Sequence, residues 1–210
     1  MRLFLTILLL SAARAGSRSP IPSGFQPAYP PSQFLLGVSF DDSTGRTLAP
    51  GSDIWPVTWA ADGNLYTAFG DGGGFGGTNQ DGRVSLGVAR VEGGQDDYRG
   101  INIAGGKNAP HPPPFGGKSE GLLAIGRTLY LWRDGDASSP GYFKFVELWS
   151  SEDFGAKWRF TGVRFSKGDG DFPAGDEGFF APAFCQFGRA YAGARDKYVY
   201  IYAPDSIDPT

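Results

Sequence analysis

Two aspartates bracket the first hairpin that the sequence predicts. Asp53 precedes a predicted strand at Val57–Trp59, and Asp71 follows the returning strand at Leu65–Phe69, 18 residues further along the chain. A hairpin runs out and back, so its two ends lie side by side. Both carboxyl groups are therefore expected at the same mouth of the blade that contains this hairpin. Glycoside hydrolysis needs such a pair, because one carboxyl protonates the leaving oxygen while the other attacks the anomeric carbon or activates water. The alternative is that both aspartates cap turns beside a glycine-rich loop.

A glycine-rich segment and several aromatic residues flank the two aspartates. The segment 72–77 has neither the Gly-Lys-Ser/Thr of a P-loop nor the helix that a dinucleotide-binding motif requires. We interpret it as a flexible loop that lets a substrate approach the backbone closely. Trp55 and Phe75 are candidates for stacking on a sugar ring, with packing in the core as the alternative, whereas Trp59 is expected in the core.

Three further polar residues occupy notable positions. Lys118 and Glu120 open a second predicted hairpin at the place that Asp53 takes in the first, and Arg195 lies near the turn of a third. Taken alone, residues of these types at these places are more typical of surface or turn positions than of ligands.

Composition narrows the fold and the function classes. With 33 glycines and 16 prolines among 210 residues, the chain favours short strands and tight turns over a helical bundle. A net charge of −3 without a basic stripe argues against a nucleic-acid partner. His111 is the single histidine, which excludes a two-His zinc site, and Cys185 is the single cysteine, which excludes an internal disulfide. The acidic stretch 169–177 lacks the spacing of an EF-hand calcium loop and is predicted to be a solvated loop. No metal or cofactor is expected.

The first 15 residues predict an export signal. A basic start at Arg2, an apolar run over Leu3–Leu10 and the Ala13-x-Ala15 site are typical of a signal peptide, and the run is too short to span a bilayer. We therefore expect a secreted, periplasmic or cell-surface protein without a membrane partner after cleavage. Residues 16–33 are predicted to form a Pro/Ser-rich lead-in, and residues 34–210 the folded domain.

The remaining chain predicts an all-β fold built from repeats. The predicted strands are Phe34–Phe40, Val57–Trp59, Leu65–Phe69, Val84–Val91, Leu122–Ile125, Leu129–Trp132, Phe143–Trp149, Trp158–Phe165 and Tyr198–Tyr202. Turns are expected between strands, as at Asp134-Gly135. A weak strand-turn-strand repeat recurs after 64 and 68 residues, marked by Tyr66, Tyr130 and Tyr198, which suits a β-propeller blade of four strands. About three such units fit, so we expect an incomplete propeller of about three blades, with the rest in missing sequence or in a second chain.

One motif marks the fold more specifically. Residues Ser151–Trp158 match S-x-D-x-G-x-x-W, the Asp-box of sialidases and other propellers. In it the Asp153 side chain ties the turn, Gly155 supplies a positive φ and Trp158 packs between strands. We expect it on a hairpin turn away from the active site, with Asp153 in a structural role.

Several motifs in order carry a family resemblance. They are Ser52-Asp53-x-Trp55, Phe69-Gly70-Asp71-Gly72, the Asp-box, and Phe187-Gly188-x-x-Tyr191-Ala192-Gly193-Ala194-Arg195-Asp196-x-Tyr198-Val199-Tyr200. From about Gly51 to Asp205 the chain resembles a family of secreted five-bladed β-propellers, long described as a domain of unknown function, that includes endo-D-arabinanases cutting the arabinan of actinobacterial cell walls. The resemblance implies Asp53 as general acid/base and Asp71 as nucleophile of a retaining mechanism, the acid having its pKa raised by a neighbouring carboxylate and partial burial. The candidate substrate-binding residues are Trp55, Phe75, Lys118, Glu120 and Arg195.

Two functions follow from these features. The first is a secreted glycoside hydrolase that cleaves polysaccharide or cell-wall glycan, and the second is a non-catalytic propeller that binds glycan or protein at the cell surface. The two differ in whether Asp53 and Asp71 converge on an open site. A sialidase is disfavoured, because its arginine triad and Tyr/Glu pair cannot be assembled from this sequence.

Overall fold

The chain divides into two units, and the described residues of the first carry little regular structure. The computed structural model describes residues 30, 32–135, 145–166, 179 and 181–203, in units Met1–Gly45 and Arg46–Thr210. The predicted strand Phe34–Phe40 is wrong: these residues are exposed, with Phe34 at 92%, and the only element described in this unit is the 3-10 turn η1 (Asp42–Thr44). An apolar run forms a strand only where a neighbour pairs with it.

Several predictions fall where the structure describes nothing. The predicted signal peptide 1–15, most of the lead-in 16–33 and the acidic stretch 169–177 lie outside the described residues. Within the described ranges, no helix is both long and apolar enough to cross a membrane.

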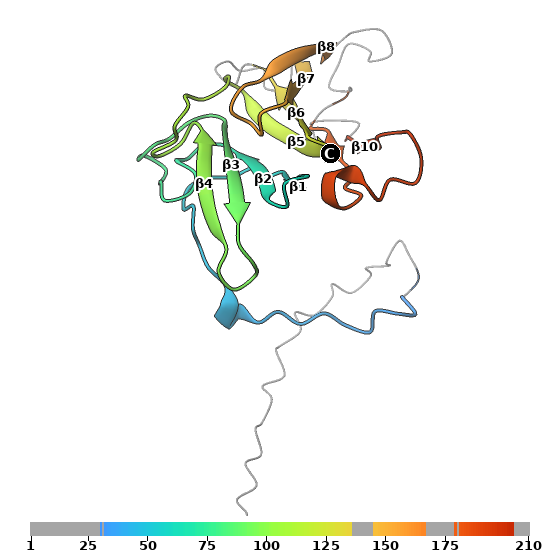
Figure 1. Ribbon diagram of the computed structural model, residues 1–210. Coiled ribbons are helices and arrows are strands. Elements are labelled where there is room, and N and C mark those ends of the chain that lie inside the picture. Colours follow the sequence, from blue (N-terminus) through green and yellow to red (C-terminus); the bar gives the residue numbers. More distant parts are fainter. Residues whose placement is uncertain (1–29, 31, 136–144, 167–178, 180, 204–210) are drawn as a thin grey trace, which may run out of the picture. The chain divides into compact units, whose positions relative to one another are not determined.

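The second unit is built from antiparallel sheets in chain order (Figure 1). The first four-stranded sheet contains β1 (Val57–Trp59), β2 (Leu65–Phe69), β3 (Gly87–Glu92) and β4 (Arg99–Ala104). The second contains β5 (Lys118–Ile125), β6 (Thr128–Asp134), β7 (Phe145–Ser151) and β8 (Arg159–Ser166). A third sheet pairs β9 (Ala183–Phe184) with β10 (Ile201–Tyr202), and the 3-10 turn η2 (Arg189–Tyr191) lies between these two strands. The all-β prediction is confirmed, while no closed sheet forms among the described residues.

The third predicted repeat unit does not form a strand-turn-strand. Gly188, Ala190 and Tyr191 all adopt positive φ, at 73°, 53° and 64°, which breaks an extended conformation. The Tyr191 hydroxyl donates to the Tyr198 carbonyl at 3.2 Å, and this folds the segment into an irregular loop. The predicted strand Tyr198–Tyr202 therefore shrinks to β10.

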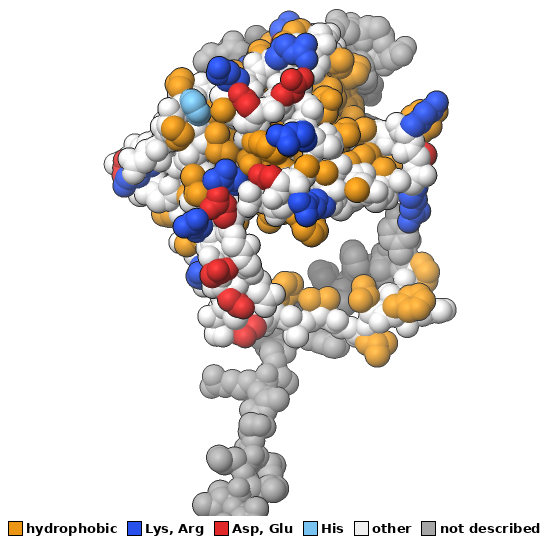
Figure 2. Space-filling view, viewed as in Figure 1, with side chains coloured by type: hydrophobic (Ala, Val, Ile, Leu, Met, Phe, Trp, Pro, Cys, Tyr) orange, Lys and Arg blue, Asp and Glu red, His pale blue; other side chains and the backbone are white. Residues whose placement is uncertain are grey.

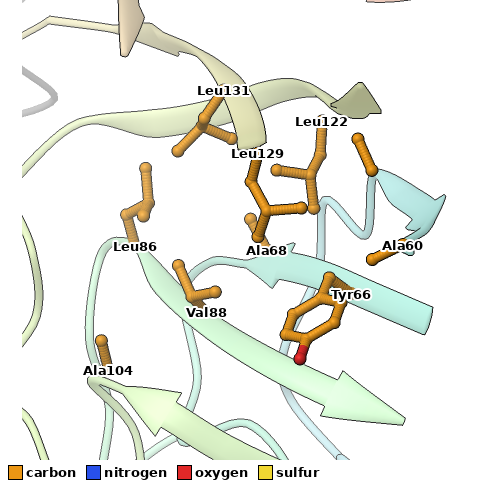
Figure 3. Close-up of a cluster of buried hydrophobic side chains, with 10 residues drawn as sticks. Ala60, Tyr66, Ala68, Leu86, Val88, Ala104, Leu122, Leu129 and Leu131 are labelled. Carbon is orange, nitrogen blue, oxygen red and sulfur yellow. The ribbon is translucent and has the colours of Figure 1, made fainter. Parts of the chain in front are cut away.

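Alternating residues of the first two sheets build a common core (Figure 3). Successive side chains of a strand point to opposite faces, so residues two apart share one face. The buried members are Ala60, Tyr66, Ala68, Leu86, Val88 and Ala104 from the first sheet and its loops, and Leu122, Ala124, Leu129 and Leu131 from the second. The Thr58 hydroxyl accepts a hydrogen bond from Ala124 N at 2.8 Å, which fixes β1 against β5.

The Asp-box forms the turn between β7 and β8. The Asp153 carboxylate accepts hydrogen bonds from the Ser151 hydroxyl and from Lys157 N, both at 2.9 Å, and Gly155 has φ +95°. The Phe154 ring stacks on Tyr66 of β2 with centroids 5.4 Å apart. The Asp153 side chain therefore ties the turn, and the turn joins the second sheet to the first.

The strands of both sheets have two distinct ends. We call one the turn end, because the tight turns after β1, β5 and β7 gather there, with Trp59 opposite Leu65 and Ile125 opposite Thr128. η2 contacts this end, since Arg189 donates to the Ala61 carbonyl and Gly126 N donates to the Ala190 carbonyl. The opposite end, where β1 and β5 begin, we call the entry end.

Candidate functional site

The first hairpin places Asp53 and Asp71 together at the entry end. Asp53 N donates to the Gly70 carbonyl at 2.9 Å and Gly70 N donates to the Asp53 carbonyl at 2.8 Å, so Asp71 directly follows the partner of Asp53. A Cβ atom built on Gly70 would lie 3.4 Å from Asp53 Oδ1 and 3.8 Å from Lys118 Cδ. The Asp53 carboxyl group and the Lys118 side chain thus lie over the same side of Gly70.

Asp71 is held by two cations from different segments. Its Oδ2 pairs with Lys118 Nζ, and its Oδ1 lies 3.2 Å from Arg83 Nη2. Arg83 also donates to the Asp71 carbonyl and, at 2.7 Å, to Asn79 Oδ1. Because the Lys118 side chain is only 7% exposed, its ion pair with Asp71 is shielded from water. Asp71 itself stays 34% exposed, so a ligand has access to this oriented carboxylate.

The start of β5 brings Lys118 to the same place, and Glu120 follows two residues further along the strand. The Ser119 hydroxyl donates to the Ile54 carbonyl at 3.3 Å, which joins the start of β5 to the start of β1. The β5–β6 register shifts between Ser119 and Gly121, so Glu120 occupies a β-bulge. Bulges redirect side chains and are frequent beside active sites.

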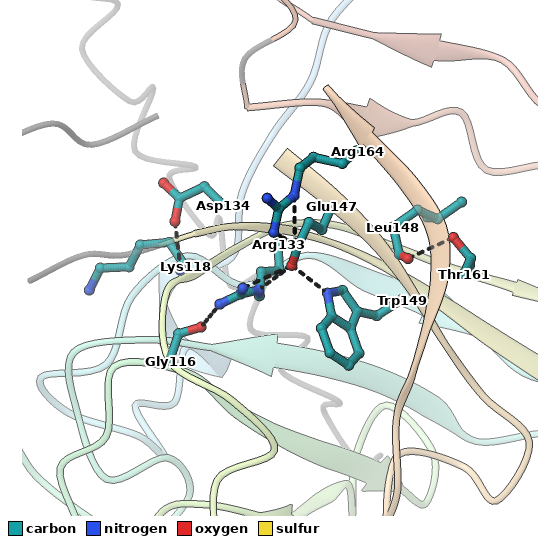
Figure 4. Close-up of polar contacts among 9 residues, drawn as sticks. All are labelled: Gly116, Lys118, Arg133, Asp134, Glu147, Leu148, Trp149, Thr161 and Arg164. Atoms are coloured by element: carbon teal, nitrogen blue, oxygen red, sulfur yellow. Dashed lines mark hydrogen bonds and ion pairs between the residues drawn. The ribbon is translucent and has the colours of Figure 1, made fainter. Parts of the chain in front are cut away.

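The structure adds Asp134, which the sequence analysis had assigned to a turn. Asp134 is instead the last residue of β6, pairs with Lys118 and is 1% exposed. Its Oδ1 accepts a hydrogen bond from Lys118 N at 2.8 Å, whereas its buried Oδ2 has no hydrogen-bond partner among the described residues. Figure 4 shows Lys118 and Asp134 to one side of the β5–β6 pair and the buried Glu147, with Arg133 and Arg164, to the other. We call Asp53, Asp71, Glu120 and Asp134 the carboxyl cluster.

Burial gives two members of the carboxyl cluster unusual protonation. Burial and the negative charge of Asp134 raise the pKa of Glu120 to about 7, and the positive charge of Lys118 opposes this rise only in part. Burial also raises the pKa of Asp134, against the hydrogen bond from Lys118 N and the charges of Lys118 and Arg133. Within the described residues, no three His, Cys, Asp or Glu side chains are grouped so as to hold a metal ion.

Trp55 and Phe75 line a surface pocket of about 300 Å³ together with Arg46 and Tyr98. The Trp55 and Phe75 ring centroids are 5.4 Å apart, and the Arg46 guanidinium lies 4.1 Å above the Tyr98 ring. Both predicted aromatic residues are half-buried, so each packs in the fold and also borders the pocket. Trp59 is not in the core as predicted: it is 48% exposed, and its indole N–H donates to a turn carbonyl.

Two residues of the glycine-rich segment serve the fold through close packing of the backbone. A Cβ atom on Gly72 would lie 2.6 Å from the Gly51 carbonyl oxygen, and one on Gly73 only 2.0 Å from the Asp81 carbonyl oxygen. The buried Asn102 amide donates to the Gly73 carbonyl at 3.2 Å and pins the loop to β4. At Gly72 and Gly73 the close approach is thus made by the chain's own backbone, whereas Gly76 of the same segment is exposed with open space around its Cα.

The structure does not bring Arg195 to the carboxyl cluster. Arg195 is exposed on the connection between η2 and β10, and η2 contacts the turn end through Arg189 and Ala190. Its neighbour Asp196 accepts hydrogen bonds from Tyr198 N and the Tyr200 hydroxyl, which orders this connection.

Comparison with known proteins assigns no family. No protein-family model matches the chain, and no curated protein matches it.

On the face drawn in Figure 2, acidic and basic side chains are interspersed with apolar ones, so this face carries no large patch of one sign of charge.

Proposed function

We propose that the chain is a secreted glycoside hydrolase, similar to endo-D-arabinanases, that cleaves glycosidic bonds of a polysaccharide or cell-wall glycan. In this proposal the two four-stranded sheets are blades of a β-propeller. The observation that carries the proposal is the oriented Asp71 carboxylate, held by Lys118 and Arg83 beside the other carboxyl groups at the entry end.

The cluster offers the two kinds of carboxyl that glycoside hydrolysis needs. A nucleophile or base must be held in place, and the ion pairs with Lys118 and Arg83 orient the Asp71 carboxylate. A second carboxyl must protonate the leaving oxygen, and Asp53 is the residue that the family resemblance assigns to this role. Retaining enzymes hold the two carboxyl groups roughly 5–5.5 Å apart and inverting enzymes roughly 6.5–9.5 Å, with retention expected here.

The pocket at Trp55 and Phe75 supports a carbohydrate substrate. Aromatic faces pack against the apolar faces of sugar rings, and Arg46 and Tyr98 add polar groups at the rim of the pocket.

The test is a hydrolysis screen of the purified full chain on polysaccharides that include arabinan. We expect wild type to release oligosaccharides and Asp71→Asn to lose at least about 10³-fold in rate. Azide should restore cleavage by Asp71→Ala and give a glycosyl azide of inverted anomeric configuration, because azide then replaces the nucleophile. Glu152→Gln, an exposed change on the Asp-box turn, is the matched control. No cleavage of any polysaccharide, or an unchanged rate in Asp71→Asn, refutes the proposal.

A second candidate is a non-catalytic binding propeller at the cell surface. The observation in its favour is that both oxygens of the Asp71 carboxylate already have partners within the chain. This candidate predicts that arabinan or another glycan is retained on the protein without cleavage and that Asp71→Asn leaves retention intact.

A further inference from the structure

Ile54 lies between two predicted site residues, Asp53 and Trp55, and has an unusual backbone conformation. Its φ is 51°, in the left-handed region, where a β-branched residue is an outlier. We infer that Ile54 is a positioning residue, whose left-handed backbone turns the Asp53 carboxyl group toward Lys118. Lys118 in turn pairs with Asp71. This inference rests on the proposed function, in which Asp53 donates the proton to the leaving oxygen.

The pairing of the first hairpin shows an extra residue beside Asp53. Val57 lies opposite Thr67, and Asp53 lies opposite Gly70. Between these two pairs the first strand has three residues and its partner has two. An extra residue of this kind makes a β-bulge, and where a bulge needs a left-handed residue, glycine normally supplies it. Ile54 takes this place without being glycine, so the surrounding structure must hold it there.

The bulge changes the face of the sheet to which Asp53 belongs. In a regular strand Asp53 would share a face with Trp55, because residues two apart do. Instead Asp53 lies opposite Gly70 and shares the face of Ala68, which packs in the core toward the second sheet. Trp55 stays on the other face, where its ring stacks on Phe69 with centroids 5.3 Å apart. The left-handed residue thus separates the directions of the Asp53 and Trp55 side chains.

The face to which Asp53 turns is the one that meets β5. On this face of β1, the Thr58 hydroxyl accepts a hydrogen bond from Ala124 N of β5 at 2.8 Å. At the entry end, a Cβ atom built on Gly70 would lie 3.4 Å from Asp53 Oδ1 and 3.8 Å from Lys118 Cδ. The bulge therefore brings the Asp53 carboxyl group to the side chain that holds Asp71.

Neighbours on both sides keep Ile54 in its strained conformation. The Ile54 carbonyl accepts a hydrogen bond from the Ser119 hydroxyl of β5 at 3.3 Å. Pro56 restricts Trp55 to an extended conformation, so the change in chain direction falls on Ile54. Before it, Asp53 is fixed by the two backbone hydrogen bonds of its bridge. Strain that the surroundings maintain in this way is typical of residues that shape a site.

The backbone conformation is tested by the relative stabilities of Ile54→Gly and Ile54→Ala in urea. Both variants lose the side chain beyond Cβ, and only glycine adopts a positive φ without steric cost. We therefore expect Ile54→Gly to unfold at a higher urea concentration than Ile54→Ala. Ile125 is the matched control, because it is exposed to a similar extent, at 36% against 37%, and lies in β5 without a positive φ. There the glycine variant should unfold at the lower urea concentration.

The positioning role is tested by Ile54→Pro, because proline fixes φ near about −65° and excludes the left-handed conformation. We expect this variant to lose at least about 100-fold in kcat on arabinan. KM should change less than about threefold, since the pocket at Trp55 lies on the other face of the sheet. Ile54→Gly should keep kcat within about threefold of wild type, because it retains the bulge.

A double variant separates positioning from a general loss of structure. Asp53→Asn alone should lose at least about 100-fold in kcat. Adding Ile54→Pro to it should cost less than about threefold more, because Ile54 acts through the carboxyl group that is already gone. A purely structural role predicts instead that the two losses multiply, and that result overturns the inference.

Other results would also overturn the inference. They are an unchanged kcat in Ile54→Pro, a large loss of kcat in Ile54→Gly, or an Ile54→Gly chain that is less stable than Ile54→Ala. The last two measurements decide the matter even if Ile54→Pro does not fold. If Asp53→Asn keeps its rate while Asp71→Asn loses it, the inference is overturned and the proposed function stands. If wild type cleaves no glycan, the proposed function fails and the inference with it.

Discussion

Burying Glu120 should leave a pH-dependent cost in the stability of the fold. Its pKa is raised from 4.5 to about 7, so between these values the folded chain holds a proton that the unfolded chain has released. The folded state then binds more protons than the unfolded state, and the free energy of unfolding falls as pH rises through this window. One pKa unit corresponds to about 1.36 kcal/mol, so the total change is roughly 3 kcal/mol.

Urea unfolding of wild type and Glu120→Gln, followed by tryptophan fluorescence from pH 4 to 9, measures this cost. We expect the wild-type free energy of unfolding, relative to that of Glu120→Gln, to fall by roughly 3 kcal/mol between pH 4.5 and 7 and then to level off. Glu92→Gln is a control of opposite sign, because the hydrogen bond from Arg99 and the charge of Arg90 lower the pKa of Glu92 against slight burial. The free energy of unfolding of wild type, relative to that of Glu92→Gln, should therefore increase as the pH rises from the acidic range, and it should become constant above pH 4.5.

A flat difference between wild type and Glu120→Gln over pH 4–8 would refute the electrostatic reasoning. The same comparison can be made in chains that also carry Asp134→Asn. Because the Asp134 charge is then absent, the free energy of unfolding should depend on pH less steeply, but the dependence should not disappear. A slope that is unchanged by Asp134→Asn would show that burial alone raises the pKa of Glu120.

Three further outcomes follow from the contacts. Lys118→Met should lower arabinan hydrolysis at least tenfold, because Lys118 holds the Asp71 carboxylate in place; initial rates on arabinan measure this loss. Asp153→Ala should cost about 1–3 kcal/mol in urea unfolding, since it leaves Lys157 N and the Ser151 hydroxyl without their acceptor, and hydrolysis below the unfolding transition should persist. Arg195→Ala should leave the hydrolysis rate within twofold of wild type, and a larger loss would place Arg195 in the site.

The sequence predicted the regular part of the fold because its signals are local. β1 and β2 have the predicted bounds, and most other predicted strands shift by a few residues. β4 was missed because its Arg-Gly-Ile-Asn-Ile-Ala sequence mixes strand formers with Gly and Asn, which are rare in strands. The buried Asn102 in this strand instead holds the glycine-rich loop, a long-range role that no local propensity reveals.

The site was predictable in part through the hairpin and the repeat. Asp53 and Asp71 lie at the entry end because they flank the strands of the first hairpin, and Lys118 and Glu120 lie there because they begin β5. Asp134 follows Asp71 by 63 residues, and each is followed by glycine, so the repeat itself contained the signal for Asp134. The protonation of Glu120 had no such signal, because it depends on a bulge and on burial across two sheets.

Carboxyl groups with enough hydrogen-bond donors and those without have opposite pKa shifts in this fold. At the turn end burial is outweighed by hydrogen bonds: Asn64 and Tyr66 lower the pKa of Asp62, and Lys157 N and Ser151 lower that of Asp153. These ionised groups each tie a turn and thus stabilise the fold.

At the entry end burial raises the pKa values of Glu120 and Asp134, whereas Glu147, although buried, has its pKa lowered by hydrogen bonds from Arg164 and Arg133. Carboxyl groups that are buried without enough donors do not stabilise a fold, so the burial of Glu120 and Asp134 needs a reason other than stability. The proposed glycoside hydrolysis would supply such a reason, because that reaction requires one carboxyl group that donates a proton and one that is ionised.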